Sequence, residues 1–94
     1  MLRTYGISGA VYEALFEAQG GVCYICRRAT GARKRLAVDH DHSCCPGLTS
    51  CGRCVRGLLC STDNKLLGHM RDDPAALLRA ADYLQNPPAR KVLT

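Results

Sequence analysis

Residues 36–42 read Leu-Ala-Val-Asp-His-Asp-His, a short apolar run followed at once by two acid–histidine pairs. A bounded apolar run predicts a short buried strand over residues 36–38, which would deliver the polar side chains at its end. If the strand persists, the acids lie on one face and the histidines on the other, whereas a turn at His40 lets all four converge. Carboxylates are hard ligands for divalent cations, and a neutral imidazole can deprotonate water. The stretch therefore carries the side chains of a candidate hydrolytic metal site.

Further metal ligands flank this stretch. Cys23 and Cys26 form a Cys-x-x-Cys pair before it, and Cys60 and Asn64 follow it. Hydrolysis of a phosphodiester with a divalent cation needs an oxygen ligand, a base for water and a small frame that fixes both near one phosphate. Because one short segment supplies all three, the sequence indicates a metal-dependent nuclease.

Length and cysteine usage limit the class of protein. The 94 residues suit one domain with a thin core that needs extra cross-links. The seven cysteines are odd in number and follow no apolar signal stretch, so reduced, metal-binding thiols fit better than disulfides. No run approaches the ~18 apolar residues of a membrane span. We therefore expect a cytoplasmic protein, in a bacterium or a phage-infected cell, without membrane association.

The formal net charge of +5 is unevenly placed along the chain. The basic loop, residues 27–35, holds five cations and no acid. A phosphate backbone is a natural partner for such a cluster, although in isolation it can equally be a solvated surface loop. Because this loop precedes the candidate site directly in the sequence, we favour binding of nucleic acid over a solvated surface loop. The residues expected to bind nucleic acid are Arg27, Arg28, Arg33, Lys34, Arg35, Arg56 and Lys65.

The first cysteine pair predicts a zinc site. Cys23 and Cys26, joined by Cys60 at the end of a predicted strand, make a half-site that needs a fourth ligand. The candidate is Asp63, because the spacing from Cys60 matches a second Cys-x-x-Cys and aspartate oxygen is an accepted zinc ligand. The alternative is that Asp63 only places a favourable charge in the first turn of a helix.

Four more thiols lie within one loop, at Cys44, Cys45, Cys51 and Cys54. In a reduced protein this cluster indicates a second tetrahedral zinc site. Adjacent ligands such as Cys44 and Cys45 fit awkwardly around one ion, so one of them can be a bystander. Two alternatives stay open: a loop of free or oxidised thiols, and a regrouping in which a loop cysteine replaces Asp63 in the first site.

Local signals place the elements around the acid–histidine stretch. Ser8 can cap a helix over residues 9–19, and residues 55–60 can form the second strand. Thr62 can cap a short helix from Asp63 to about His69.

The strongest local signal lies near the C-terminus. Asp73 as N-cap and Pro74 at the first helical position predict a helix over residues 74–85, which residues 86–88 would stop. Residues 89–94 are expected to be a frayed tail. The predicted fold is one small α+β domain, a zinc-stapled ββα core between a packing helix and a C-terminal helix that closes over it.

Several motifs follow one another along the chain: Gly20-Gly21-Val22-Cys23-x-x-Cys26, residues 36–42, Val55-Arg56-Gly57-Leu58-Leu59-Cys60, Asn64 and Leu67-Gly68. In this order they resemble the recombination endonuclease VII family, a branch of the HNH, or ββα-metal, nucleases common in bacteriophages. The resemblance covers about residues 5–85, and we expect a nuclease domain over residues 1–86 with a flexible tail over residues 87–94.

By this resemblance, Asp39 and Asn64 would hold a catalytic Mg²⁺ or Mn²⁺, His40 would be the general base, and His42 would contact or polarise the scissile phosphate. Structural zinc would be bound by Cys23, Cys26, Cys60 and residue 63. The family usually has cysteine at this last position, where this chain has Asp63. Its junction-resolving member carries a long helical C-terminal part for dimerisation that has no equivalent after Leu84, so junction resolution is not carried over.

The expected function is metal-dependent cleavage or nicking of DNA by a monomer or small dimer, with one or two structural zinc ions. The competing class is a non-catalytic zinc module that binds nucleic acid or protein. That class would make both histidines structural and would leave Asp39, His40, His42 and Asn64 without a joint purpose.

Overall fold

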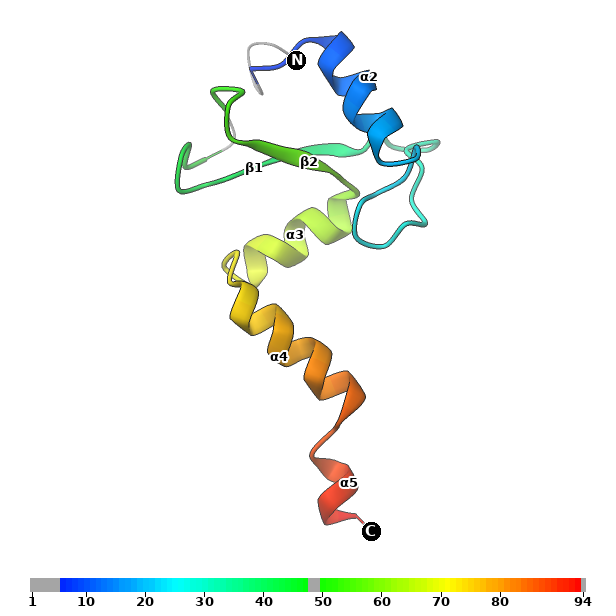
Figure 1. Ribbon diagram of the computed structural model, residues 1–94, viewed down its shortest axis with the longest axis vertical. Coiled ribbons are helices and arrows are strands. Elements are labelled where there is room, and N and C mark those ends of the chain that lie inside the picture. Colours follow the sequence, from blue (N-terminus) through cyan, green and yellow to red (C-terminus); the bar gives the residue numbers. More distant parts are fainter. Residues whose placement is uncertain (1–5, 48–49, 94) are drawn as a thin grey trace. The chain divides into compact units, whose positions relative to one another are not determined.

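The computed structural model describes residues 6–47 and 50–93 (Figure 1). It is a small α+β fold in which a two-stranded sheet is followed by helices, as the sequence predicts. Residues 1–5 and 48–49 of the expected nuclease domain, and Thr94 of the expected tail, lie outside the described residues. The elements, in chain order, are α2 (Gly9–Ala18), β1 (Ala37–His40), β2 (Val55–Leu59), α3 (Ser61–His69), α4 (Pro74–Gln85) and α5 (Ala89–Val92).

Contacts divide the chain into two compact units, residues 1–64 and residues 65–94. The first unit holds α2, the sheet, the first turn of α3 and all seven cysteines. The second holds the rest of α3 with α4 and α5. A single domain over residues 1–86 stays a prediction. Among the described residues, no helix has the length and apolar character needed to cross a bilayer.

The helix α2 forms where the sequence predicts it. Ser8 caps it by accepting a hydrogen bond from Val11 N at 3.2 Å, and Gln19 follows its last residue. The Tyr12 side chain is buried and donates its hydroxyl to Leu36 O at 2.7 Å. This bond attaches α2 to the segment that leads into β1.

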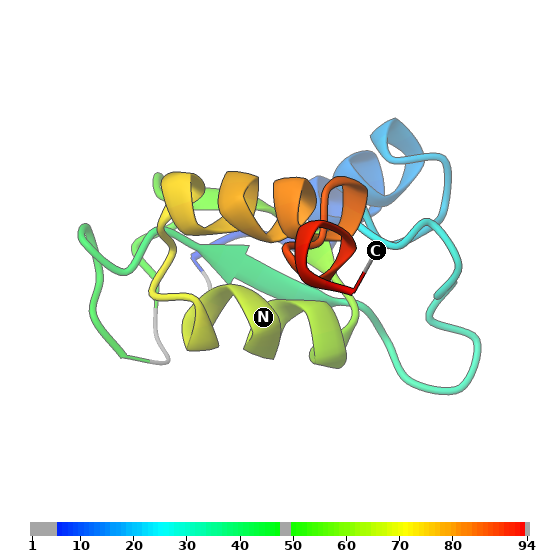
Figure 2. The same ribbon diagram turned by 90° about the horizontal axis from the view of Figure 1, so that it is seen from below.

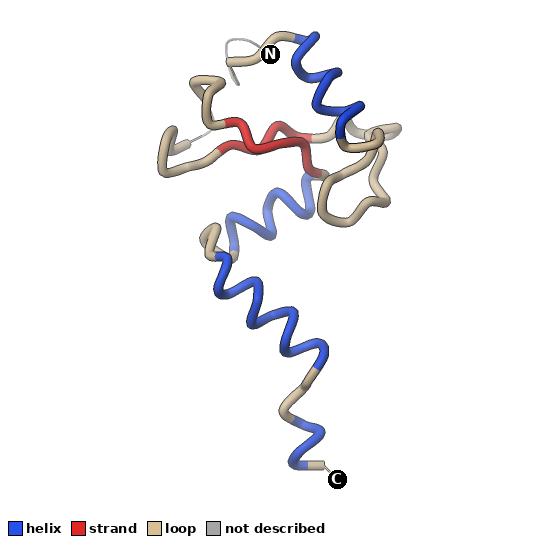
Figure 3. Tube along the Cα trace, in the orientation of Figure 1, coloured by secondary structure: helices blue, strands red, loops and turns tan. Residues whose placement is uncertain are grey.

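The strands β1 and β2 pair in antiparallel register (Figure 3), with Val38 opposite Leu58 and Asp39 opposite Gly57. A register shift falls between Asp39 and His40, which is where β1 ends. The strand predicted over residues 36–38 therefore begins one residue late and continues through two polar residues. It can do so because the Asp39 carboxylate is neutralised within the sheet by Arg56.

The core of the first unit is thin, and polar groups complete it. The buried apolar side chains are Ile7, Tyr12, Cys23, Leu36, Val38, Leu58 and Leu59. Gln19 acts as a substitute strand partner for β2: Leu58 N donates to its Oε1 at 2.8 Å, and its Nε2 donates to Leu58 O at 2.9 Å. A Cβ atom at Gly57 would lie 2.9 Å from this Oε1, so glycine leaves room for the amide.

Two loops extend from opposite ends of the sheet. The basic loop lies at the end where β1 begins and β2 finishes, and residues 41–47 and 50–54 lie at the other end (Figure 2). Cys60 follows β2 at the first end, and His40 ends β1 at the second. Each end of the sheet is thus close to one of the two cysteine groups.

The helix α3 begins at Ser61, so Thr62 lies inside it and is not its cap. The predicted start was wrong because helical hydrogen bonding already begins at Cys60, whose carbonyl accepts from Asn64 N at 2.9 Å. The cysteine that ends the strand therefore also starts the helix.

In the second unit, α4 spans residues 74–85 as predicted, and Asp73 Oδ1 accepts a hydrogen bond from Ala75 N at 3.0 Å. None of its residues is buried, and Leu78 and Leu84 are largely exposed. That this helix closes over the core stays a prediction. The segment expected to be a frayed tail contains a helical turn, α5. It forms because Pro88 already has helical backbone angles, and its carbonyl accepts a hydrogen bond from Lys91 N at 3.1 Å.

Candidate active site and metal centres

The first cysteine group consists of Cys23, Cys26, Cys60 and Asp63, whose candidate ligand atoms all lie within 4.8 Å of one another. Cys23 Sγ lies 3.2 Å from Asp63 Oδ2, and Asp63 N lies 3.5 Å from Cys60 Sγ. The carboxylate faces the thiols, while the loop cysteines gather elsewhere. The arrangement can hold zinc with the ligand set expected from the sequence.

A tight turn prepares the Cys-x-x-Cys pair for metal. Cys23 N donates to Ala29 O at 2.8 Å, and Arg27 N donates to Cys23 O at 3.0 Å with Arg27 in a left-handed conformation. Backbone N–H groups of Ala29 and Arg28 donate to the Cys26 sulfur and hold its pKa below the usual value. These dipoles favour the thiolate, which is the form that binds zinc.

The electrostatics of Asp63 also suit a ligand. Burial raises the pKa of Asp63, but hydrogen bonds from Cys23, Cys60 and Cys26 outweigh it, and the net shift is downward. The carboxylate is therefore ionised at neutral pH and can offer oxygen to a cation.

The loop cysteine group consists of Cys44, Cys45, Cys51 and Cys54, and its four sulfurs also lie within 4.8 Å of one another. Cys51 Sγ lies 3.8 Å from Cys44 Sγ and 3.9 Å from Cys54 Sγ, and the Cys44 and Cys45 sulfurs are 3.9 Å apart. Four thiolates at a Zn–S distance of about 2.3 Å form a tetrahedron with edges of about 3.8 Å. Both adjacent cysteines belong to the group, and this set too can hold zinc.

Charge within the loop cysteine group is unevenly shared. The backbone N–H of Arg53 is the main reason why the pKa of Cys51 falls to about 6. Hydrogen bonding with Cys51 raises the pKa of Cys44 to about 12. Without a cation the group therefore holds its negative charge first at Cys51.

Asp39 is buried in the sheet and makes a bidentate ion pair with Arg56. Arg56 Nε lies 2.7 Å from its Oδ2, and Arg56 Nη2 lies 3.0 Å from its Oδ1. The sequence had suggested Arg56 as a contact for nucleic acid; the structure directs its guanidinium to Asp39. A buried carboxylate needs a cation nearby, and here the protein's own arginine fills that role.

His40 is 4% exposed, and its Nε2 lies 2.9 Å from Cys45 O. A carbonyl oxygen can only accept, so Nε2 must carry the proton, and the neutral ring then has its lone pair on Nδ1. The His42 ring lies beside it, with ring centroids 4.5 Å apart. The Cys45 carbonyl is a functional group that residue-type patterns could not reveal, because every residue has one.

Asn64 is half-buried on α3, directly after Asp63, and its backbone is tied to Cys60. The structure thus brings His40 and His42 together and fixes Asn64 next to the first cysteine group. Within residues 6–47 and 50–93, no hydrogen bond joins the Asn64 side chain to Asp39.

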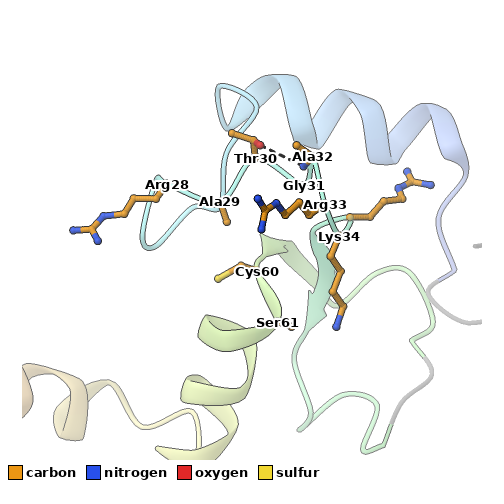
Figure 4. A pocket seen from close by; sticks show the side chains of 10 residues that line it. Arg28, Ala29, Thr30, Gly31, Ala32, Arg33, Lys34, Cys60 and Ser61 are labelled. Atoms are coloured by element: carbon orange, nitrogen blue, oxygen red, sulfur yellow. Dashed lines mark hydrogen bonds between the residues drawn. The ribbon is translucent and has the colours of Figure 1, made fainter.

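The basic loop borders a cavity of about 390 Å³ that Cys60 and Ser61 also line (Figure 4). Arg33 extends over the cavity toward the end of β2, and Arg28 points away from it. Arg35 is engaged within the fold, because its guanidinium lies 4.2 Å from the Tyr12 ring centroid and 3.9 Å from Glu13.

The remaining basic residues have other surroundings. Arg27 lies in the Cys-x-x-Cys turn, Lys34 also borders the cavity, and Lys65 is exposed on α3 in the second unit. Of the cations expected to bind nucleic acid, Arg28, Arg33, Lys34 and Arg35 line this cavity.

Comparison with known proteins gives consistent results. A Gene 59 protein of Mycobacterium phage D29 is 53% identical over 94 residues, which cover 99% of this chain and 52% of the relative. A Gene 59 protein of Mycobacterium phage L5 is 51% identical with the same coverage, so the chain spans about half the length of these curated relatives. No solved structure matches the chain. The family model described as recombination endonuclease VII matches residues 1–86, and the chain therefore belongs to that family.

Proposed function

We propose that this chain is a metal-dependent DNA endonuclease or nickase of the HNH type, with His40 as its general base. Membership of the recombination endonuclease VII family implies a nuclease that acts on DNA. The observation that carries the finer assignment is the 2.9 Å contact from His40 Nε2 to Cys45 O. It fixes the tautomer that leaves Nδ1 able to accept a proton.

The proposed cation site consists of Asp39 and Asn64. A carboxylate and an amide oxygen are hard donors that suit Mg²⁺ or Mn²⁺, and the buried Asp39 carboxylate already attracts a cation, Arg56. When bound there, a divalent ion supplies Lewis-acid stabilisation of the charge that develops on the phosphate. The softer cysteine groups would take zinc, so the two kinds of metal do not compete for ligands.

The protein's own residues perform the remaining steps. His40 Nδ1 takes a proton from water, and the resulting hydroxide attacks phosphorus opposite the 3′ oxygen. The P–O3′ bond breaks, and the leaving oxygen takes a proton from solvent. His42, beside His40, contacts the phosphate and limits its movement. Arg28, Arg33 and Lys34 neutralise backbone phosphates on either side.

The proposal covers phosphodiester cleavage in the cytoplasm of a bacterial or phage-infected cell. Junction resolution is not part of the proposal. The chain spans about half the length of its curated relatives, so activities of the whole relatives are not assigned to it.

A nicking assay tests this function. Supercoiled plasmid incubated with the zinc-loaded chain should be nicked when Mg²⁺ or Mn²⁺ is added and stay intact when EDTA is present. A brief, mild EDTA treatment should leave the tightly held zinc in place, which elemental analysis of the same sample verifies. DNA that is bound yet never cut under any of these metal conditions would favour the non-catalytic zinc module.

A further inference from the structure

We propose that the loop cysteine group binds a zinc ion whose role is to hold the Cys45 carbonyl on His40, so that this ion sets the orientation of the general base. The inference rests on the proposed function. It assigns the loop zinc ion, which is separate from the cation proposed at Asp39 and Asn64, a role in positioning the general base. Its starting point is that one residue, Cys45, belongs both to the thiol group and to the contact with His40.

The thiols converge without an apolar core to drive them together. Cys44 and Cys51 are exposed, and Cys45 and Cys54 are only partly buried. All four are free, with neighbouring sulfurs 3.8–3.9 Å apart, far beyond the ~2.05 Å of a disulfide bond. These distances match the edges of a zinc–thiolate tetrahedron. A bound cation explains why four polarisable, ionisable groups gather at the surface.

Few covalent bonds separate the loop cysteine group from the contact with His40. Cys45 contributes its sulfur to the group and its carbonyl to the histidine ring, at 2.9 Å from Nε2. Only its own Cα and Cβ atoms and its carbonyl carbon separate the sulfur from that oxygen. An ion that fixes the sulfur therefore limits where the carbonyl can go.

The backbone ties both ends of the loop to the end of β1. Asp41 N donates to Cys54 O at 2.9 Å, and the N–H groups of Cys44 and Cys45 donate to Asp41 O at 3.1 and 3.2 Å. These bonds join Asp41, the residue directly after His40, to three of the four thiol-bearing residues. A displacement of the cysteines would thus be passed directly to the segment that carries the base.

Among the described residues of the loop, further attachments lie at Ser50 and Gly52. Ser50 is buried and accepts a hydrogen bond from Gly52 N at 3.0 Å, and Gly52 packs against the backbone of Gly6 so closely that a Cβ atom at position 52 would lie 2.2 Å from Gly6 O. These contacts fix the position of residues 50–52, whereas Cys45 is attached through the hydrogen bond from its N–H to Asp41 O. A bound ion would add a second attachment at the Cys45 sulfur and so restrict the direction of its carbonyl.

The consequence for His40 concerns the tautomer of its ring. With the Cys45 carbonyl in place, the neutral ring keeps its proton on Nε2, and Nδ1 is the basic nitrogen. Without that acceptor the ring would share its proton between both nitrogens and lose its fixed orientation. A fraction of the molecules would then present the wrong nitrogen to water.

The test compares the wild-type chain with Cys51→Ser and with Arg53→Lys. Cys51 belongs to the group, whereas Arg53 is an exposed residue of the same loop that offers no ligand and whose charge lysine keeps. Three quantities are measured: zinc per chain by elemental analysis, the His40 tautomer by nitrogen-15 NMR at a pH where the ring is neutral, and the plasmid-nicking rate with Mn²⁺.

We expect two zinc ions in the wild type and in Arg53→Lys, and one in Cys51→Ser. The His40 ring should be a single Nε2-protonated tautomer in the first two proteins and a mixture in the third. Nicking by Cys51→Ser should fall about 10- to 100-fold. Cys51→His, which keeps a zinc-binding side chain, should restore the second ion and the single tautomer, and this variant covers the case in which Cys51→Ser does not fold.

One zinc ion in the wild type would overturn the proposal, and so would an unchanged His40 tautomer in a Cys51→Ser protein that has lost one ion. Zinc content and the imidazole spectrum are read without DNA. If the wild-type chain shows both but cuts no DNA, the proposed function fails while the metal-to-histidine link stands.

Discussion

At the scale of single residues, the sequence predicts which side chains matter better than it predicts their partners. The positions of Asp39 and His40 after a short apolar run mark them as candidates, and both are buried at the end of β1. Their partners could not be predicted in the same way. Arg56 meets Asp39 only because β2 pairs with β1, and the acceptor for His40 is a backbone carbonyl.

The Arg56–Asp39 pair predicts competition with the catalytic cation. Arg56→Gln removes a positive charge that occupies both carboxylate oxygens, so Mn²⁺ should bind several-fold more tightly in the absence of DNA. The fold should lose about 1–3 kcal/mol of unfolding free energy, because a buried carboxylate loses its partner. Electron paramagnetic resonance of free Mn²⁺ gives the affinity, with exposed Arg53→Gln as control. Equal Mn²⁺ affinity in all three proteins would show that Arg56 does not compete.

Asp63 gives a second prediction at this scale. If its carboxylate is a zinc ligand, Asp63→Cys should retain or tighten the ion in the first cysteine group, since thiolate suits zinc at least as well. Asp63→Ala should lose zinc more readily and unfold at a lower temperature. Zinc retention against a chelator and thermal melting measure both effects. An Asp63→Ala protein with wild-type retention, and a stability loss well under ~1 kcal/mol, would reduce Asp63 to a favourable charge at a helix start.

At the scale of elements, local signals predict helices well and the sheet less well. The cap and proline at residues 73 and 74 fix the start of α4, because both act within one helical turn. The start of α3 was misplaced by two residues because Cys60 links the strand to the helix. The register shift after Asp39 depends on strand pairing, which no local pattern encodes.

Gln19 provides a prediction for the sheet. Its side-chain amide hydrogen-bonds to both backbone polar groups of Leu58, and Leu58 is fully buried. Gln19→Ala leaves Leu58 N without its acceptor, while Leu58 O keeps the longer bond from Tyr24 N at 3.4 Å, so the change should cost about 1–3 kcal/mol. Urea denaturation measures the loss. The neighbouring Glu17→Ala, at an exposed position of α2, is the control and should change stability by less than ~0.5 kcal/mol. A Gln19→Ala protein as stable as this control would mean that water replaces the amide.

At the scale of the whole molecule, the family was predictable because its motifs are ordered along the chain, and all of them except Leu67-Gly68 fall within the first compact unit. The grouping of the seven cysteines was only partly predictable. Spacing indicated Cys23, Cys26 and Cys60, but the convergence of the adjacent Cys44 and Cys45 on one point needed the backbone path of the loop. How much of the chain folds as one domain stays a prediction, since residues 65–94 form a separate compact unit.

The distribution of charge predicts how DNA binding depends on salt. Arg33 borders the cavity beside the basic loop, so Arg33→Gln should weaken binding to all sequences alike. The slope of log affinity against log salt should fall by about 1. Arg79→Gln, on α4 in the second unit, is a charge-matched control that should leave the slope unchanged. Fluorescence anisotropy on a duplex at several salt concentrations measures it, and equal slopes for Arg33→Gln and wild type would remove Arg33 from the interface.

The most direct test of the account is the single-turnover cleavage rate of His40→Ala, with His69→Ala as control. His69 is exposed on α3 and has no proposed role, so its loss should leave the rate near that of the wild type. His40→Ala should cut DNA about 10²- to 10⁴-fold more slowly while DNA affinity and zinc content stay nearly unchanged. Cleavage by His40→Ala at close to the wild-type rate would contradict the assignment of His40 as the general base.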